Sequence, residues 1–136
     1  MGYVVLGAWV IQAGVGVWLF ARWLFGGGGG AGTVVTHVAV AAASLVAWMA
    51  FVVTGAVAWG WVAFAIVTAG NAIGDSMLVR RHRRRAGTRG FRRDYGAAIA
   101  AVFRGRMPRP VAFHALFAGV VYFTCLGVCI GATIAR

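Results

Sequence analysis

Residues 33–54 read TVVTHVAVAAASLVAWMAFVVT, an apolar run that contains no Asp, Glu, Lys or Arg. An α-helix rises about 1.5 Å per residue, so a helix over this run would be about 33 Å long, close to the roughly 30 Å hydrocarbon core of a bilayer. The run therefore predicts a transmembrane helix. His37 is the one ionisable side chain inside it.

Three further runs of the same kind occur at about residues 3–25, 57–79 and 111–135. The chain has 136 residues, of which 62% are hydrophobic and 11% are charged, whereas soluble domains carry about 25% charged residues. Only Gly55 and Ala56 separate the second run from the third, so these two helices must be antiparallel neighbours. The sequence thus predicts an all-α integral membrane protein, a single domain over residues 1–136 folded as an up-down four-helix bundle.

The basic residues are concentrated between the third and fourth runs. The chain has 13 Lys+Arg against 2 Asp+Glu, a net charge of +11, and all the basic residues are arginine. The arginines of this stretch are Arg80, Arg81, Arg83, Arg84, Arg85, Arg89, Arg92, Arg93, Arg104, Arg106 and Arg109. Short arginine-rich loops remain in the cytoplasm, so residues 80–110 are expected to form a cytoplasmic basic loop in a multi-pass membrane protein. Both termini then face outward (N-out/C-out).

The arginine-rich stretch also indicates a partner. Arginines at the membrane surface attract anionic lipid headgroups, and we assign that role to Arg83, Arg84 and Arg85. Nucleic acid or a cytoplasmic protein is the less favoured alternative, because topology already accounts for the position of the arginines. The apolar run at 95–103, too short to span a bilayer, is expected to form an interfacial helix.

Polar residues at membrane depth are rare and mark functional sites. His37 would lie roughly 6 Å inside the second run, and His114 roughly 7.5 Å inside the fourth. Both runs start from the arginine-rich side, so the two imidazoles are expected at nearly the same height. Because the second and fourth helices of an up-down bundle are diagonal, the two rings are expected to face each other across the core.

Two facing imidazoles are the ligand arrangement of a b-type haem. Small residues about one or two turns further along each helix would leave room for the porphyrin, aromatic residues beyond them would wall the pocket, and arginines at the cytoplasmic edge would pair with the propionates. The residues in these roles are Ala41, Ser44, Ala118, Trp48, Phe51, Tyr122, Arg80 and Arg109.

Other interpretations of the same residues remain open. Either histidine could simply lie at the level of the lipid headgroups. Alternatively, the pair could bind a metal ion together with Asp75, or form hydrogen bonds to a quinone. Asp75, with Asn71 one turn before it, is expected either to orient a histidine by accepting its second ring proton or to pair with Arg80 or Arg109.

The cysteines, Cys125 and Cys129, lie four residues apart in the last run. Two cysteines one turn apart on a helix are poorly placed for a disulfide. We expect both to be buried as small hydrophobic residues.

A set of short motifs supports the haem interpretation: Thr36-His37, Trp48, Phe51, Thr54-Gly55, Ala58-Trp59 and Phe113-His114-Ala115. In these motifs the chain resembles small actinobacterial four-helix membrane proteins with two histidines, in the general plan of bis-histidine membrane b-type cytochromes. The resemblance covers the second to fourth runs. It implies haem b as cofactor and a plasma-membrane location in a GC-rich bacterium.

The leading functional hypothesis is a membrane-embedded b-type cytochrome, or cytochrome-like subunit, that transfers electrons. The alternatives are a cofactor-free structural or regulatory subunit, which docks on a larger complex or forms a homo-oligomer, and a small transporter or channel with Asp75 in its pathway. A hydrolytic enzyme is disfavoured, because these residues supply no set of nucleophile, base and orienting group.

Overall fold

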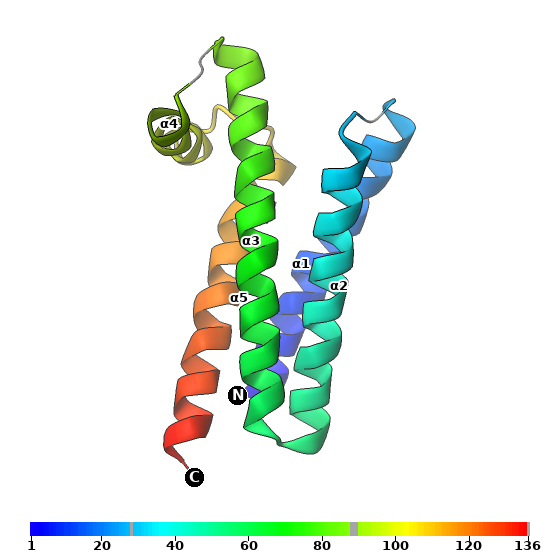
Figure 1. The fold of residues 1–136 in the computed structure, drawn as a ribbon, viewed down its shortest axis with the longest axis vertical. Helices are drawn as coiled ribbons and strands as arrows, with labels where there is room; N and C mark the ends of the chain where they lie inside the picture. Colours follow the sequence, from blue (N-terminus) through cyan, green and yellow to red (C-terminus); the bar gives the residue numbers. More distant parts are fainter. Residues whose placement is uncertain (28, 88–89, 136) are drawn as a thin grey trace.

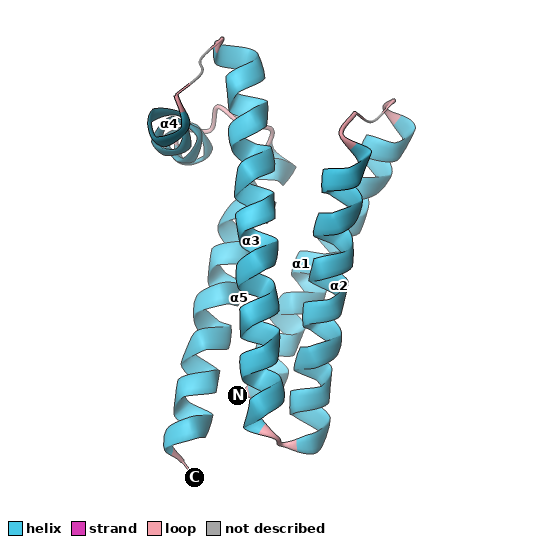
Figure 2. Ribbon diagram, in the orientation of Figure 1, coloured by secondary structure: helices cyan, strands magenta, loops and turns pink. Residues whose placement is uncertain are grey.

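Four long helices and one short helix make up the structure. The computed structural model describes residues 1–27, 29–87 and 90–135, and over these residues it contains helices and no strand (Figure 2). The helices are α1 (Gly2–Phe25), α2 (Ala31–Thr54), α3 (Val57–Ala86), α4 (Phe91–Phe103) and α5 (Arg109–Ile134). All but α4 are long and apolar enough to cross a bilayer. The predicted all-α class and four apolar helices are confirmed.

The long helices form an up-down bundle. α1 packs against α2 and α5, and α3 packs against the same two helices, so α2 and α5 are diagonal. A tight turn joins α2 to α3, because Gly55 adopts a left-handed φ of 69° and its N–H donates to the Phe51 carbonyl at 2.9 Å. Both termini lie at the end of the bundle that holds this turn, and α4 lies at the opposite, arginine-rich end (Figure 1).

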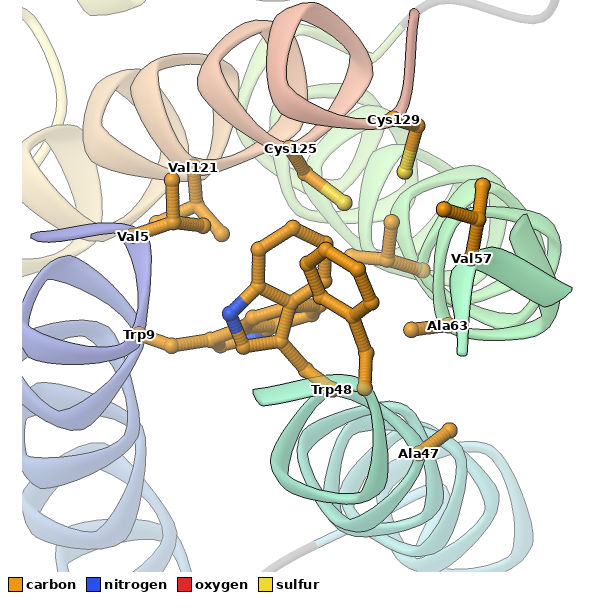
Figure 3. Packing of buried hydrophobic residues seen from close by; sticks show 11 residues of the cluster. Val5, Trp9, Ala47, Trp48, Val57, Ala63, Val121, Cys125 and Cys129 are labelled. Atoms are coloured by element: carbon orange, nitrogen blue, oxygen red, sulfur yellow. The ribbon is translucent and has the colours of Figure 1, made fainter. Parts of the chain in front are cut away.

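The core nearer the termini is aromatic (Figure 3). The fully buried Trp48 ring lies 5.4 Å from that of Trp9 and 5.0 Å from that of Phe51, measured between centroids. Its Nε1–H donates to the Gly2 carbonyl at 3.2 Å, which satisfies the buried indole. Cys125 and Cys129 lie in the same cluster, fully buried and not disulfide-bonded. The expected burial of both cysteines is confirmed.

The arginine-rich end is packed structure and not a solvated loop. α3 continues beyond its expected end at residue 79, and α4 docks on α3 and α5 through a second buried cluster. Its members are Leu78, Val79, Ala98, Ala101, Val102 and Met107. The short run at 95–103 therefore forms a helix, as expected, but that helix starts at Phe91. Arg89 and Arg136 lie outside the described residues, as does the side chain of Arg92.

Candidate functional site

Two imidazoles face each other across the bundle from diagonal helices. The ring centroids of His37 on α2 and His114 on α5 are 6.3 Å apart, with 77° between the ring planes. Each residue lies about one and a half turns inside the arginine-rich end of its helix. The matched depth that the sequence indicates thus brings the two histidines together.

The His37 imidazole is held by the backbone of α3. Its Nδ1 lies 3.1 Å from the Gly70 carbonyl oxygen, so Nδ1–H donates there and Nε2 keeps its lone pair. One turn further along α3, a Cβ on Gly74 would lie 3.1 Å from the ring's Cε1. Ligating histidines are commonly oriented by such a bond from the other ring nitrogen. His37 therefore has a fixed ring orientation and a free nitrogen.

α1 lies against the His114 ring and is bonded to the His114 backbone. A Cβ on Gly16 would lie 3.3 Å from the His114 Cε1, and the Gln12 side-chain amide donates to the His114 carbonyl oxygen at 2.9 Å. With His37 and the Gly70 carbonyl, all four long helices contribute to the site. We refer to Gln12, His37, His114 and the three glycines Gly16, Gly70 and Gly74 as the histidine site.

Two buried polar atoms of the histidine site have no hydrogen-bond partner among the residues that the structure describes. They are Nδ1 of His114 and Oε1 of Gln12. An unsatisfied buried polar atom costs about 1–3 kcal/mol, and native proteins rarely leave one without a water or a ligand. The site therefore has the unused hydrogen-bonding capacity of a place that receives a polar group.

The residues expected to line a haem pocket differ from one another in burial and in contacts. Ala41 is exposed on the outside of α2, so the glycines of α1 and α3, and not Ala41, make room for the rings. Ser44 is fully buried and its hydroxyl donates to the Ala41 carbonyl, while Ala118 is half-buried on α5. The Tyr122 ring packs against that of Phe64 in a tilted arrangement, with 4.9 Å between ring centroids.

The aromatic residues expected to wall the pocket lie deeper in the bundle. Trp48 and Phe51 fill the core nearer the termini, and Trp48 is about 16 Å beyond His37 along α2. They belong to that core and do not wall the histidine site.

Asp75 serves the docking of α4. Its Oδ2 accepts a hydrogen bond from the Tyr95 hydroxyl at 2.9 Å. This bond connects α3 to α4. It differs from both expected interactions of Asp75, a hydrogen bond to a histidine and an ion pair with Arg80 or Arg109. Asn71 is half-buried one turn before Asp75 on the same helix.

The two arginines expected to pair with propionates lie at the rim of this end of the bundle. The guanidinium of Arg80 donates to the Thr33 hydroxyl at 3.3 Å, which ties α3 to the start of α2. Arg109 is exposed at the first turn of α5.

The metal-ion alternative lacks a third ligand. Among the described residues, no group of three or more His, Cys, Asp or Glu side chains is placed to hold a metal ion. Asp75 bonds to Tyr95 instead, so among the described residues it does not join His37 and His114 as a third metal ligand.

The three arginines assigned to lipid are not equivalent. Arg84 and Arg85 are exposed, but the guanidinium Nε of Arg83 lies 2.7 Å from Oδ2 of Asp94, whose side chain is 2% exposed. Arg83 therefore helps to fasten α4 to α3. Gln12, expected from the sequence to form a hydrogen bond between helices, does so with the His114 carbonyl oxygen. The sequence did not single out Gly16, Gly70 or Gly74, although the four-residue spacing of Gly70 and Gly74 is a signal for close helix contact.

Comparison of the chain with protein-family models, with curated proteins and with solved structures gives no match. The functional assignment therefore depends on the geometry of the histidine site.

Proposed function

We propose that the chain is a multi-pass protein of the bacterial plasma membrane whose histidine site binds haem b, making it a b-type cytochrome or a cytochrome-like electron-transfer subunit. The observation that carries the proposal is the 6.3 Å separation of the His37 and His114 rings. An imidazole nitrogen lies about 2 Å from a metal that it ligates. If one nitrogen of each ring points at a shared metal ion, two such bonds would account for about 4 Å of the separation, and the distance from each nitrogen to its ring centre would account for most of the rest.

The outer surface of the long helices supports a membrane location. Large apolar side chains are exposed along all four of them, with examples in Val17, Val46, Trp59, Leu116 and Phe123. An exposed apolar surface of this extent suits contact with lipid. With the arginines gathered at one end, the positive-inside rule places that end in the cytoplasm and both termini outside.

The residues of the histidine site have distinct roles in this proposal. His37, oriented by the Gly70 carbonyl, and His114 would each hold the haem iron through a ring nitrogen. Gln12 anchors the backbone of His114 and so limits movement of α5 against α1. The rim arginines, Arg80 and Arg109, would pair with propionates. Haem iron with two imidazole ligands supplies one-electron transfer when bound.

The proposal is tested by the visible spectrum of the full chain, purified in detergent from cells supplied with haem. We expect a low-spin, six-coordinate haem spectrum that both His37→Ala and His114→Ala abolish. Thr124→Ala is the matched control on α5, because the Thr124 hydroxyl bonds only to carbonyls of its own helix among the contacts shown. Its spectrum should be that of the wild type. A folded, colourless wild-type protein would refute the proposal.

A cofactor-free subunit that docks on a larger complex is the second candidate. It is favoured by the small residues of α5: Gly119, Gly127 and Gly131 have open space where a Cβ would lie, so the bundle does not use them for its own packing. Such residues let a helix of another subunit, or of a second copy, approach closely. A colourless protein that crosslinks to another chain through α5 would support this candidate.

A further inference from the structure

A cavity of about 280 Å³ lies at the arginine-rich end, between α3, α4 and the connection to α5. Four nitrogen-bearing side chains line it: His82 and Arg85 from α3, and Arg104 and Arg106 from the segment that follows α4. Alanines of α3 and α4, and the buried Met107, supply the remaining wall. We call this the basic cavity. It shares no residue with the histidine site.

The positive charge of the basic cavity has no counter-charge in its lining. The chain contains only two acidic residues, Asp75 and Asp94. Neither lines the cavity: Asp94 is paired with Arg83, and Asp75 accepts a hydrogen bond from Tyr95. Clustered like charges repel one another unless an anion lies between them. Arg85, Arg104 and Arg106 are exposed, and the chain itself supplies no anion to them, so any anion bound here comes from outside the chain.

The turn after α4 holds two of the arginines in a defined position. Gly105 adopts a left-handed φ of 66°, the Gly105 N–H donates to the Val102 carbonyl, and the Arg106 N–H donates to the Ala101 carbonyl at 2.9 Å. These two bonds close the C-terminus of α4 in the manner of a Schellman motif. Arg104 and Arg106 thus flank one glycine on a turn whose backbone is fixed by hydrogen bonds, so the backbone loses little conformational freedom when the two exposed side chains bind a ligand.

We propose that the basic cavity is a binding site for a phosphate group, of the size of a phosphoglycerol headgroup. Guanidinium groups match the oxygens of a phosphate through paired, charge-assisted hydrogen bonds. The volume is near the lower end of the roughly 300–1,000 Å³ of ligand pockets, which suits a headgroup-sized anion. The alanine and methionine wall suits the carbon atoms beside the phosphate.

Two sources could supply this phosphate group, an anionic phospholipid or a soluble phosphate. If the long helices span a bilayer, α4 lies at the depth of the headgroups, where phosphatidylglycerol would reach the cavity from the side. The phosphate chemistry is the same in both cases. Haem plays no part in it, so failure of the haem proposal leaves this inference standing.

The test uses the full chain in neutral-detergent micelles at about 0.15 M salt, where the Debye length is about 8 Å. Short-chain phosphatidylglycerol, short-chain phosphatidylcholine and inorganic phosphate are titrated separately by calorimetry. We expect saturable binding of phosphatidylglycerol or of inorganic phosphate, and not of phosphatidylcholine. Binding of the lipid alone identifies a headgroup site, and binding of inorganic phosphate identifies a site open to soluble phosphates.

Three variants determine whether the cavity itself binds the ligand. Each arginine near an anionic headgroup is worth about 1 kcal/mol, or about fivefold, so Arg104→Gln with Arg106→Gln should weaken binding roughly 25-fold. Arg81→Gln with Arg93→Gln removes the same charge from two residues that do not line the cavity, and it should change binding less than about threefold. Ala100→Leu fills the cavity without changing any charge and should also abolish binding.

The inference is overturned if the two arginine pairs weaken binding equally, because the attraction would then be diffuse. It is also overturned if Ala100→Leu binds like the wild type, or if neither ligand binds. Circular dichroism of each variant shows whether it is folded. Ala100→Leu retains all the arginines, so it provides an independent test if the arginine pair does not fold.

Discussion

Gly74→Ala is expected to destabilise the bundle by displacing the His37 ring. In a helix interior this change is intrinsically favourable by about 0.5–1 kcal/mol, because alanine loses less backbone entropy. At Gly74, however, the new Cβ would lie 3.1 Å from the His37 Cε1, inside the roughly 3.5–4.0 Å of an ordinary carbon contact.

The ring has little room to withdraw from this new methyl group. Its Nδ1 is bonded to the Gly70 carbonyl, on the same face of α3, and the His114 ring lies 6.3 Å away. Overpacking of this kind costs about 1–3 kcal/mol. Set against the helix gain, the net loss should be about 1 kcal/mol.

The measurement is reversible unfolding of the purified protein by a denaturing detergent, followed by circular dichroism. Gly119→Ala is the control, because a Cβ there meets nothing within 4 Å, and it should be neutral or slightly stabilising. Gly16→Ala, with 3.3 Å to the His114 Cε1, should fall between the two. If Gly74→Ala proves as stable as Gly119→Ala, the His37 ring is not held as described.

Three further predictions concern α4, Tyr95 and topology. Asp94→Asn removes the charge that pairs with Arg83 and should lower stability by about 1–3 kcal/mol; hydrogen exchange should then speed up in α4 and not in α2, whereas uniform exchange would contradict a local role. The hydrogen bond to Asp75 raises the pKa of Tyr95 above its usual value of about 10, and burial raises this pKa further by a smaller amount. The stabilisation from this bond should be complete below about pH 10 and lost as the pH rises through the raised pKa; in an ultraviolet titration Asp75→Asn should shift the tyrosinate transition back, and an unchanged transition would count against the bond. A cytoplasm-only reporter fused to the C-terminus should be silent, and a strong signal would reverse the proposed orientation.

The course of the main helices follows from the sequence alone. Residues 33–54 and the three similar runs are too apolar for water and long enough for a bilayer, and the helices of the structure coincide with them over most of their lengths. The meeting of His37 and His114 was also predictable, because a helix rises by a constant amount per residue and the chain alternates direction at each short turn. Matched distances from the helix starts are therefore matched heights.

Only the tertiary structure decided what surrounds the two histidines. Which face of α1 or α3 meets an imidazole depends on how the helices rotate about their axes, and the weak amphipathicity of these apolar runs leaves that rotation open. Gly16, Gly70 and Gly74 were therefore not predictable as neighbours of the rings, nor was the His114 backbone predictable as the partner of Gln12.

The arginine-rich end shows the same division. The sequence determines that the charge gathers there, because residues 80–109 hold most of the arginines. Three features depend on α4 folding back onto α3 and α5: the ion pair of Arg83 with Asp94, the hydrogen bond of Tyr95 to Asp75, and the basic cavity. Local propensity cannot specify this docking, since the apolar face of α4 is short. Its burial is determined by contacts between residues distant in the sequence.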